Sequence, residues 1–226
     1  MALNVFSNPI RNQTLKAMPE YQDKEVITPV DKAYVALMMK DADNKSENAR
    51  KFVEGLKPKY GAALISTLRF IYNATGNRLT FVGYRDWEGH IGDSPYPLLL
   101  ENGQWGAFLH VHHGSFAATI YCGQDENGDA FDWILSWYNP RNDTRSGNNG
   151  VCTEIHEANQ FKGINRSSIH DNVWGKLTNA DHHYSSATLN GCYSIVITGY
   201  SDVIDSDNRI SPIFEGIMTL KNAWIQ

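Results

Sequence analysis

From Asn73 to Pro140, short runs with strand character alternate with tight-turn signals, and this block limits the possible folds more than any other feature of the chain. Four Asn-Gly dipeptides lie in this block and beyond it, at residues 102–103, 127–128, 149–150 and 190–191. Asn-Gly favours the primed turns that join antiparallel strands, because both central residues of such a turn take a positive φ. The chain is therefore expected to fold as an antiparallel β-sandwich or barrel.

The beginning of the chain follows a different pattern, which predicts helices. Thr28 offers a cap, Pro29 stands at the first helical position and Asp31 lies in the first turn, so a helix is expected to begin here. A second, shorter helix is expected after Ser46, and it should end before Pro58, because proline disrupts a helix interior.

Beyond these helices the apolar period changes toward two, which indicates strands. A further helix should interrupt the later strands between Ser167 and Leu177, and the polar stretch from Arg141 to Gly150 should be an exposed loop. We therefore predict a helical N-terminal segment over residues 1–60 and a β-sandwich domain over residues 61–226. The expected fold class is mainly β, an antiparallel sandwich with this helical segment and at least one later helix.

Charge and composition exclude several classes of partner. The chain of 226 residues carries 20 Lys and Arg against 25 Asp and Glu, without a basic cluster. Nucleic acid is not an expected partner, because phosphate binding depends on Lys and Arg. The sequence has no apolar run of transmembrane length, and Met1 to Leu15 lack the apolar core of a signal peptide, so we expect a cytoplasmic protein. Its three cysteines fit reduced thiols better than a disulfide framework.

The histidines raise the hypothesis of a metal site. From Gln104 to His113, strict alternation places Trp105 toward the core and His110 and His112 on the opposite face. Two histidines on one strand face lie roughly 7 Å apart and could bind a metal with a third ligand from a neighbouring strand. A polar outer face explains the same pattern and is favoured, so neither a metal nor a cofactor is predicted.

Nucleophilic catalysis has little support in the sequence. Cys152 and His156 are four residues apart in a strand-like run, which would separate them by roughly 13 Å. The nucleophile-elbow, phosphate-loop and HExxH patterns do not occur. We therefore expect a protein without catalytic residues.

Aromatic residues near strand ends are the stronger functional signal. Trp105 and Trp133 are expected to fill the core, as large aromatic side chains usually do. Trp137 and Tyr138 come directly before Asn139, a proline and the polar loop, so at least one of them should face outward. An exposed ring at this strand end could stack on a sugar or hold a quaternary ammonium group by cation–π attraction.

The candidate ligand-binding residues are thus Trp137 and Tyr138, with Ser136 as a hydrogen-bonding partner. Tyr96 and Trp87 are the second choices. Packing of these rings in the core is the alternative that the residue pattern leaves open.

Several motifs in the chain resemble the small jasmonate-induced protein family of plants. They are YNATG at 72–76, DWxGH at 86–90, SPYP at 94–97, NGQW at 102–105, FLHV at 108–111 and WxxxWxNP at 133–140. The resemblance extends to residues 153–155 and 190–192 and covers most of the chain. It implies a stress- and defence-associated protein with no assigned catalytic activity.

More distantly, the order of features resembles the actinoporin-like sandwich proteins, among them Nakanori, a fungal protein that recognises sphingomyelin with cholesterol. Residues 136–138 and Pro140 lie where actinoporins build part of a phosphocholine site. The corresponding helix here offers Trp174 and no tyrosine, which leaves the choice of headgroup open. The resemblance implies recognition of a lipid headgroup by peripheral contact with a membrane.

Two alternatives to lipid recognition are kept. The first is a carbohydrate-binding lectin on the same fold, and the second is a metal-binding or enzymatic protein that uses His110 and His112. Pore formation is not expected, because two short helices separated by the polar stretch 41–48 precede the sandwich. The oligomeric state is left open.

Overall fold

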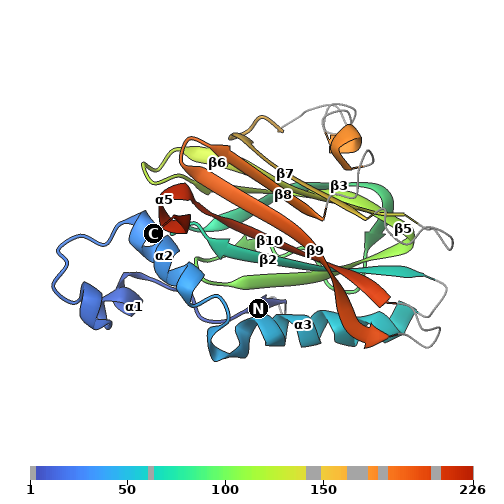
Figure 1. Ribbon diagram of the computed structural model, residues 1–226, viewed down its shortest axis with the longest axis horizontal. Helices are drawn as coiled ribbons and strands as arrows, with labels where there is room; N and C mark the ends of the chain where they lie inside the picture. The colour runs from blue at the N-terminus through green and yellow to red at the C-terminus, as the bar shows by residue number, and fades with distance from the viewer. Residues whose placement is uncertain are drawn as a thin grey trace.

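The computed structural model describes residues 4–60, 64–140, 149–161, 173–177, 183–204 and 210–225. Two β-sheets pack face to face, and the N-terminal helices cover the outer side of one of them (Figure 1). The predicted fold class, mainly β with an N-terminal helical segment, is confirmed. Most of the loop expected from Arg141 to Gly150 and the first part of the helix expected from Ser167 to Leu177 lie outside the described residues.

The helical elements lie mainly before the first long strand. They are α1 (Asn12–Lys16), α2 (Pro29–Met38), α3 (Lys45–Leu56), the 3-10 turns η1 (Pro19–Tyr21), η2 (Ala42–Asn44) and η3 (Lys57–Tyr60), a helical turn at 173–177, and α5 (Lys221–Trp224). The strands are β1 (Val5–Phe6), β2 (Ile65–Ala74), β3 (Leu79–Ile91), β4 (Leu99–Leu100), β5 (Trp105–Gln124), β6 (Ala130–Asn139), β7 (Gly150–Glu157), β8 (Tyr184–Leu189), β9 (Cys192–Ile204) and β10 (Ile210–Leu220).

The start of α2 follows from its sequence, as predicted. The hydroxyl of Thr28 accepts a hydrogen bond from the backbone N–H of Asp31 at 3.2 Å, and the Asp31 carboxylate accepts one from the N–H of Thr28 at 2.8 Å. Pro29 stands at the first helical position, where its missing N–H costs nothing. This reciprocal capping satisfies two backbone donors that would otherwise have no partner within the helix.

The long strand β5 belongs to both sheets. Its first part pairs with β2, and the first sheet continues from β2 through β10 and β9 to β8. Its second part, from Ser115 onward, pairs with β6 and β3, and β6 pairs with β7 to complete the second sheet. All these pairs are antiparallel except β2 with β10, which is parallel and which no local turn signal predicts.

The side-chain alternation of β5 changes phase where the strand passes from one sheet to the other. Before the change, Phe108 and other even-numbered residues face the interior between the sheets. After it, Phe116 and the even-numbered residues that follow pack on the outer face of the second sheet, while Ala117 and Tyr121 face the interior. The pairing with β3 is irregular at this place, because Val111 is opposite His90 and Phe116 is opposite Glu88. The strand therefore does not keep one strict alternation.

The Asn-Gly dipeptides behave as predicted in part. Asn190 and Gly191 take φ values of 45° and 79°, as a primed turn requires, and they join β8 to β9. Gly103 and Gly128 also have positive φ, at 86° and 94°. The turn expected at 149–150 is wrong, because Gly150 lies in β7, where a Cβ would clash with the backbone oxygen of Leu177.

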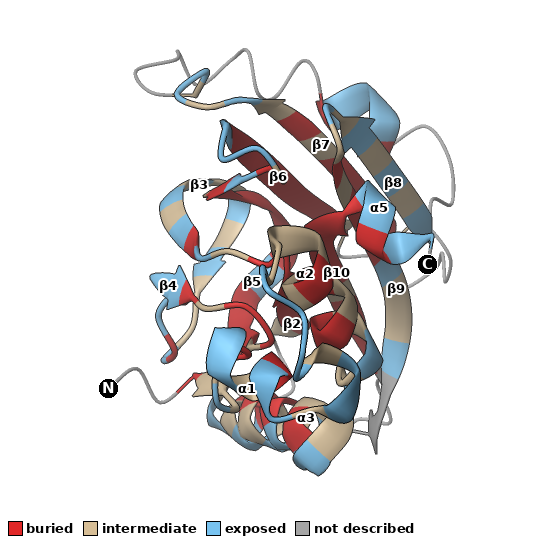
Figure 2. Ribbon diagram, turned by 90° about the vertical axis from the view of Figure 1, so that its left-hand side faces the viewer, coloured by how far each residue is buried: buried red, intermediate tan, exposed pale blue. Residues whose placement is uncertain are grey.

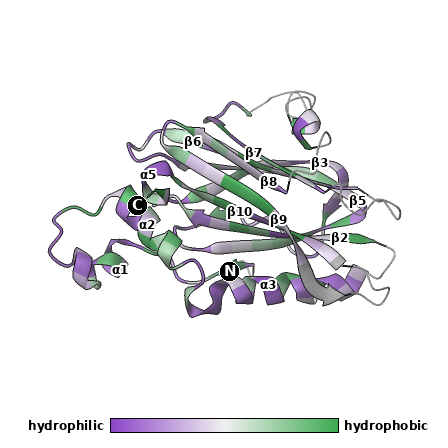
Figure 3. Cartoon of the chain, in the orientation of Figure 1, coloured by the Kyte–Doolittle hydropathy of each residue, from purple (hydrophilic) through white to green (hydrophobic). Residues whose placement is uncertain are grey.

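Two apolar cores hold the layers together, and Figure 2 shows their buried residues along β5, β6 and β10 and on parts of α2 and α3. Trp133 fills the interior between the sheets, and Trp105 fills the space between the first sheet and the helices. Both are buried, as predicted. Figure 3 shows hydrophilic residues along much of the outer side of α3, which faces away from the sheet.

The expected boundary near residue 60 falls between η3 and β2. β1 nevertheless pairs with β5, and the helices share a core with the first sheet, so the two parts are packed together. The division into a helical segment over residues 1–60 and a β-sandwich domain over residues 61–226 stays a prediction. Within the described ranges, no helix combines the length and the apolar character needed to cross a bilayer.

Candidate functional site

Three of the five predicted site residues are buried, which corrects the expectation that they lie at an open rim. Trp137 is in the interior between the sheets, where its Nε1–H donates to Ser115 Oγ at 2.8 Å. Ser136 is fully buried and donates its hydroxyl to the backbone oxygen of Cys152 at 2.8 Å. Tyr96 is 6% exposed, and its hydroxyl donates to Asp86 at 3.2 Å. These side chains position the strands and have no free surface for a ligand.

The other two predicted residues, Tyr138 and Trp87, come together on the outer face of the second sheet. Phe116 lies between them, with ring centroids 4.2 Å from Trp87 and 5.6 Å from Tyr138. Trp174 completes the group, because its ring lies 4.9 Å from Phe116 and 5.9 Å from Tyr138. We call Trp87, Phe116, Tyr138 and Trp174 the aromatic cluster. Binding of a ligand by Tyr138 and Trp87 stays a prediction.

Strand register and the helical turn at 173–177 explain why the four rings meet. Phe116 on β5 is directly opposite Tyr138 on β6 and next to the position of Trp87 on β3. The helical turn packs on the same face, and its inward side chains share an apolar cluster with residues of β5, β6 and β7: Val173 and Leu177 with Phe116, Ala118, Ile120, Ile134 and Cys152. This packing places Trp174 at the edge of the turn, with 39% of its surface exposed.

A carboxylate lies beside the aromatic cluster. Glu88 follows Trp87 on β3, is exposed, and occupies the space over Gly114, where a Cβ would clash with its carboxylate. Burial, and to a smaller extent the negative charge of Glu88, raise the pKa of Tyr138, so this phenol stays neutral near pH 7. Aromatic faces with an adjacent carboxylate suit an organic cation better than an anion.

The comparison with known proteins agrees with this fold. A family model described as Nakanori-like protein matches residues 6–219. The chain belongs to the Nakanori-like protein family. The solved structure of the lipid binding protein Nakanori is similar to it with a TM-score of 0.76 and 26% sequence identity, covering 95% of this chain and 98% of Nakanori.

Two plant proteins are similar in sequence to this Nakanori-like chain. The 23 kDa jasmonate-induced protein of Hordeum vulgare is 42% identical over 193 residues, which is 81% of this chain and 89% of the barley protein. A jasmonate-induced protein homolog of Atriplex canescens is 29% identical over 100 residues, covering 43% of this chain and 54% of its own length. The resemblance to the jasmonate-induced family is thereby confirmed. The Xerocomus chrysenteron lectin XCL overlaps with a TM-score of only 0.44 at 11% identity, which carries no functional argument.

The predicted outward position of His110 is wrong for this Nakanori-like chain. His110 is fully buried, with Nδ1 2.8 Å from Ser115 Oγ and Nε2 3.3 Å from Asp86 Oδ1. His112 is exposed instead, and its ring lies 5.8 Å from that of His90. Because one histidine is inside and the other outside, the two do not form the pair that a shared metal would need. In the described part of the chain, no group of three or more His, Cys, Asp or Glu residues has a geometry that could hold a metal.

Ser115, His110 and Asp86 lie in the order of a catalytic triad, yet their surroundings indicate a structural network. Ser115 is fully buried and its hydroxyl already accepts the Trp137 N–H. Burial also lowers the pKa of His110, although the hydrogen bond that its ring donates to the Asp86 carboxylate opposes this shift. The network of the Nakanori-like chain thus fixes Trp137 beneath the strand end that carries Tyr138.

The sequence also raised Cys152 and His156 as a possible catalytic pair. Cys152 and His156 both lie on β7, as the strand-like pattern predicted. Burial raises the pKa of the Cys152 thiol to about 11, so it remains protonated near pH 7.

Sequence reasoning missed Phe116 and Glu88. The signal was present, because Phe116, Ala118 and Ile120 form an alternating apolar row that needs a cover. Its outward direction could not be foreseen without the change of phase in β5.

Proposed function

We propose that this protein is a non-catalytic, stress-associated lipid-binding protein that recognises a choline-bearing headgroup, of the sphingomyelin type, through the aromatic cluster. The observation that carries the proposal is the meeting of Trp87, Tyr138 and Trp174 around Phe116, with Glu88 beside them. Similarity to a protein named lipid binding protein and to proteins named jasmonate-induced supports it.

The chemistry follows from the surface that each ring presents. Trp174 is partly exposed and can offer a ring face to a quaternary ammonium group, and a cation over an aromatic ring is stabilised by about 0.5–2 kcal/mol. Glu88 adds a negative charge that a choline group would neutralise. Contact would be peripheral, with the headgroup at the sheet face and the lipid chains left in the membrane.

Vesicle flotation tests this function. Wild-type protein should bind vesicles of sphingomyelin and cholesterol better than vesicles of phosphatidylglycerol and cholesterol, whose headgroup carries no cation. Trp174→Ala should weaken binding about 10-fold, because one cation–π contact of about 1.4 kcal/mol corresponds to that factor. Trp224→Ala is the matched control, since Trp224 on α5 is similarly exposed at 41% and lies outside the aromatic cluster.

The proposal fails if wild-type protein shows no preference for the choline lipid, or if Trp174→Ala binds as well as Trp224→Ala. A glycan array run in parallel addresses the lectin alternative. Sugar binding that is lost in Trp174→Ala, together with no vesicle binding, would assign the same rings to a carbohydrate.

We also propose that the protein works inside the cell. Cys122, Cys152 and Cys192 are all free thiols, which fits a reducing compartment. Fractionation of the cell with an antibody against the protein tests this, and recovery from the extracellular fluid would overturn it.

A further inference from the structure

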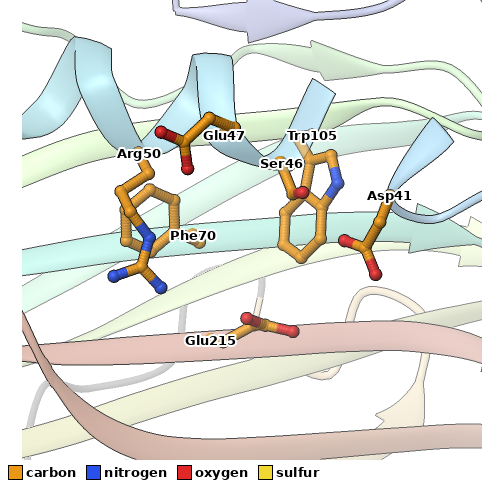
Figure 4. Close-up of a pocket in the computed structure, with 7 residues that line it drawn as sticks. All are labelled: Asp41, Ser46, Glu47, Arg50, Phe70, Trp105 and Glu215. Carbon is orange, nitrogen blue, oxygen red and sulfur yellow. The ribbon is translucent and has the colours of Figure 1, made fainter. Parts of the chain in front are cut away.

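A cavity of about 200 Å³ lies between α3 and the outer face of the first sheet (Figure 4). It is on the opposite side of the molecule from the helical turn at 173–177 that carries Trp174 (Figure 1). We call it the α3 cavity. Its charged and aromatic lining residues are Asp41, Glu47, Arg50, Phe70, Trp105 and Glu215.

Glu215 is a charged residue on a strand face whose neighbouring positions are apolar. Ile213 and Ile217, two residues before and after it on β10, are buried in the core beneath the helices. The Glu215 side chain is only 24% exposed, so a carboxylate stands where the helix–sheet contact calls for an apolar residue. Placing a charge at such a contact costs free energy, and local departures of this kind concentrate at functional sites.

The carboxylates around the α3 cavity form ion pairs with lysines, whereas in the described part of the chain the arginine beside them does not. Lys40 lies 3.2 Å from Glu215 and 3.6 Å from Asp41, and Lys51 lies 3.4 Å from Glu47. Arg50 is half-buried and lines the same cavity, yet it forms no ion pair with a carboxylate of the described residues. Figure 4 shows the Arg50 guanidinium and the carboxylates arranged around a common space. The cavity thus presents both a guanidinium without an ion pair among the described residues and several carboxylates.

The floor of the α3 cavity is aromatic and rigid. Trp105 donates its Nε1–H to the backbone oxygen of Lys40 at 2.9 Å, and its ring packs 4.7 Å from that of Tyr72. Phe70 lies beside it on β2 and is buried in the same core. Trp105 is 1% and Phe70 4% exposed, so these rings form a closed apolar floor beneath the charged side chains.

We propose that the α3 cavity binds a small zwitterion, with an ammonium group and an anionic group a few atoms apart. Arg50 receives the anionic group, and Glu47 and Glu215 receive the ammonium group, above the floor that Phe70 and Trp105 form. A free amino acid and a phosphoethanolamine group share this chemistry. The site is independent of the aromatic cluster.

Isothermal titration calorimetry with four soluble probes tests the proposal. Phenylalanine carries both charges, phenethylamine only the ammonium, 3-phenylpropionate only the carboxylate, and phosphoethanolamine both charges without a ring. Phenylalanine or phosphoethanolamine should bind, and each single-charge analogue should bind at least about 10-fold more weakly than phenylalanine, because a charge-assisted contact is lost. Flotation with phosphatidylethanolamine vesicles distinguishes a headgroup from a free zwitterion.

Variants connect the binding to the cavity. Arg50→Gln and Glu215→Gln should each weaken binding of the zwitterion about 10-fold or more. Glu47→Gln is a second test, because Glu47 lies on the exposed surface of α3. If Glu215→Gln does not fold, the loss of zwitterion binding in Glu47→Gln tests the role of the carboxylates. Lys59→Gln is the matched control, because Lys59 is 58% exposed, pairs with Asp93 and does not line the cavity.

Trp174→Ala should leave zwitterion binding unchanged, so failure of this site and failure of the lipid site are separable. The proposal is overturned if none of the four probes binds, if phenethylamine binds as tightly as phenylalanine, or if Arg50→Gln and Glu47→Gln bind like Lys59→Gln.

Discussion

Replacement of Arg69 by methionine should make the protein more stable, although it removes the largest polar side chain of the interior. Arg69 on β2 is fully buried, and its guanidinium lies 4.0 Å from the ring centroid of Trp137 and 4.8 Å from that of Phe214. None of its three side-chain nitrogen atoms has a hydrogen-bond partner among the described residues. Burial lowers the pKa of this guanidinium, which means that its charge is poorly solvated in the folded state.

The size of the effect follows from two opposing contributions. An unpaired ion in a protein interior costs several kcal/mol even after local relaxation. Contact with the two aromatic rings offsets part of this cost, by about 2 kcal/mol or more for each desolvated cation–π pair. Methionine is unbranched and adaptable, so it can fill most of the same space without the charge. We therefore expect Arg69→Met to raise the free energy of unfolding by about 1–4 kcal/mol, the stabilisation seen when buried ion pairs are replaced by apolar residues.

Urea unfolding at pH 7, followed by far-ultraviolet circular dichroism, measures this change. Thermal unfolding should show a rise in Tm of about 2–4 °C for each kcal/mol in a chain of this size. Arg78→Met is the matched control, because Arg78 is exposed and pairs with Glu101 at 2.9 Å, so its loss should change stability by about 0.5 kcal/mol or less. If Arg69→Met unfolds more easily than wild type, the ring contacts outweigh the desolvation and the reasoning is refuted.

Three further predictions concern stability. Burial lowers the pKa of His110 below 6.5 in the folded protein, so the unfolded chain binds more protons and stability should fall as pH drops below about 6.5. The variant His110→Gln should show a weaker fall in the free energy of unfolding over this pH range, measured by urea unfolding. Parallel pH profiles of the variant and the wild type would contradict this prediction. Thr28→Ala should lose about 1 kcal/mol in the same assay through loss of the α2 cap, and an unchanged midpoint would contradict the capping geometry. Gly191→Ala should destabilise by about 1 kcal/mol because its φ is 79°, while Gly55→Ala in α3, with open space around its Cβ, should stabilise by about 0.5–1 kcal/mol; equal signs would contradict the argument.

Local rules of the chain could be predicted from the sequence because they depend on neighbouring residues. The cap at Thr28 and the primed turn at Asn190 and Gly191 need only a few positions in a row, and both were predicted correctly. The burial of Trp105 and Trp133 followed from alternation and ring size.

Features that depend on distant residues could not be predicted in this way. The parallel pairing of β2 with β10 joins segments at opposite ends of the sandwich sequence, and nothing near either strand specifies it. The position of Trp137 depends on Ser115, a partner on another strand, so neighbouring residues could not show that its ring turns inward. Tyr138 is the next residue on the strand, so its side chain points to the opposite face and joins the aromatic cluster.

The change of phase in β5 determines which face of the sheet each later side chain of the strand occupies. If the alternation of residues 105–111 continued through the strand without this change of phase, every later side chain would lie on the opposite face of the sheet. Phe116 would then face the interior of the sandwich and Ser115 would face outward. Trp87 would lose its contact with Phe116, and the Trp137 N–H would lose its hydrogen-bond acceptor. One irregular step in a single strand therefore sets both the binding face and the interior that supports it.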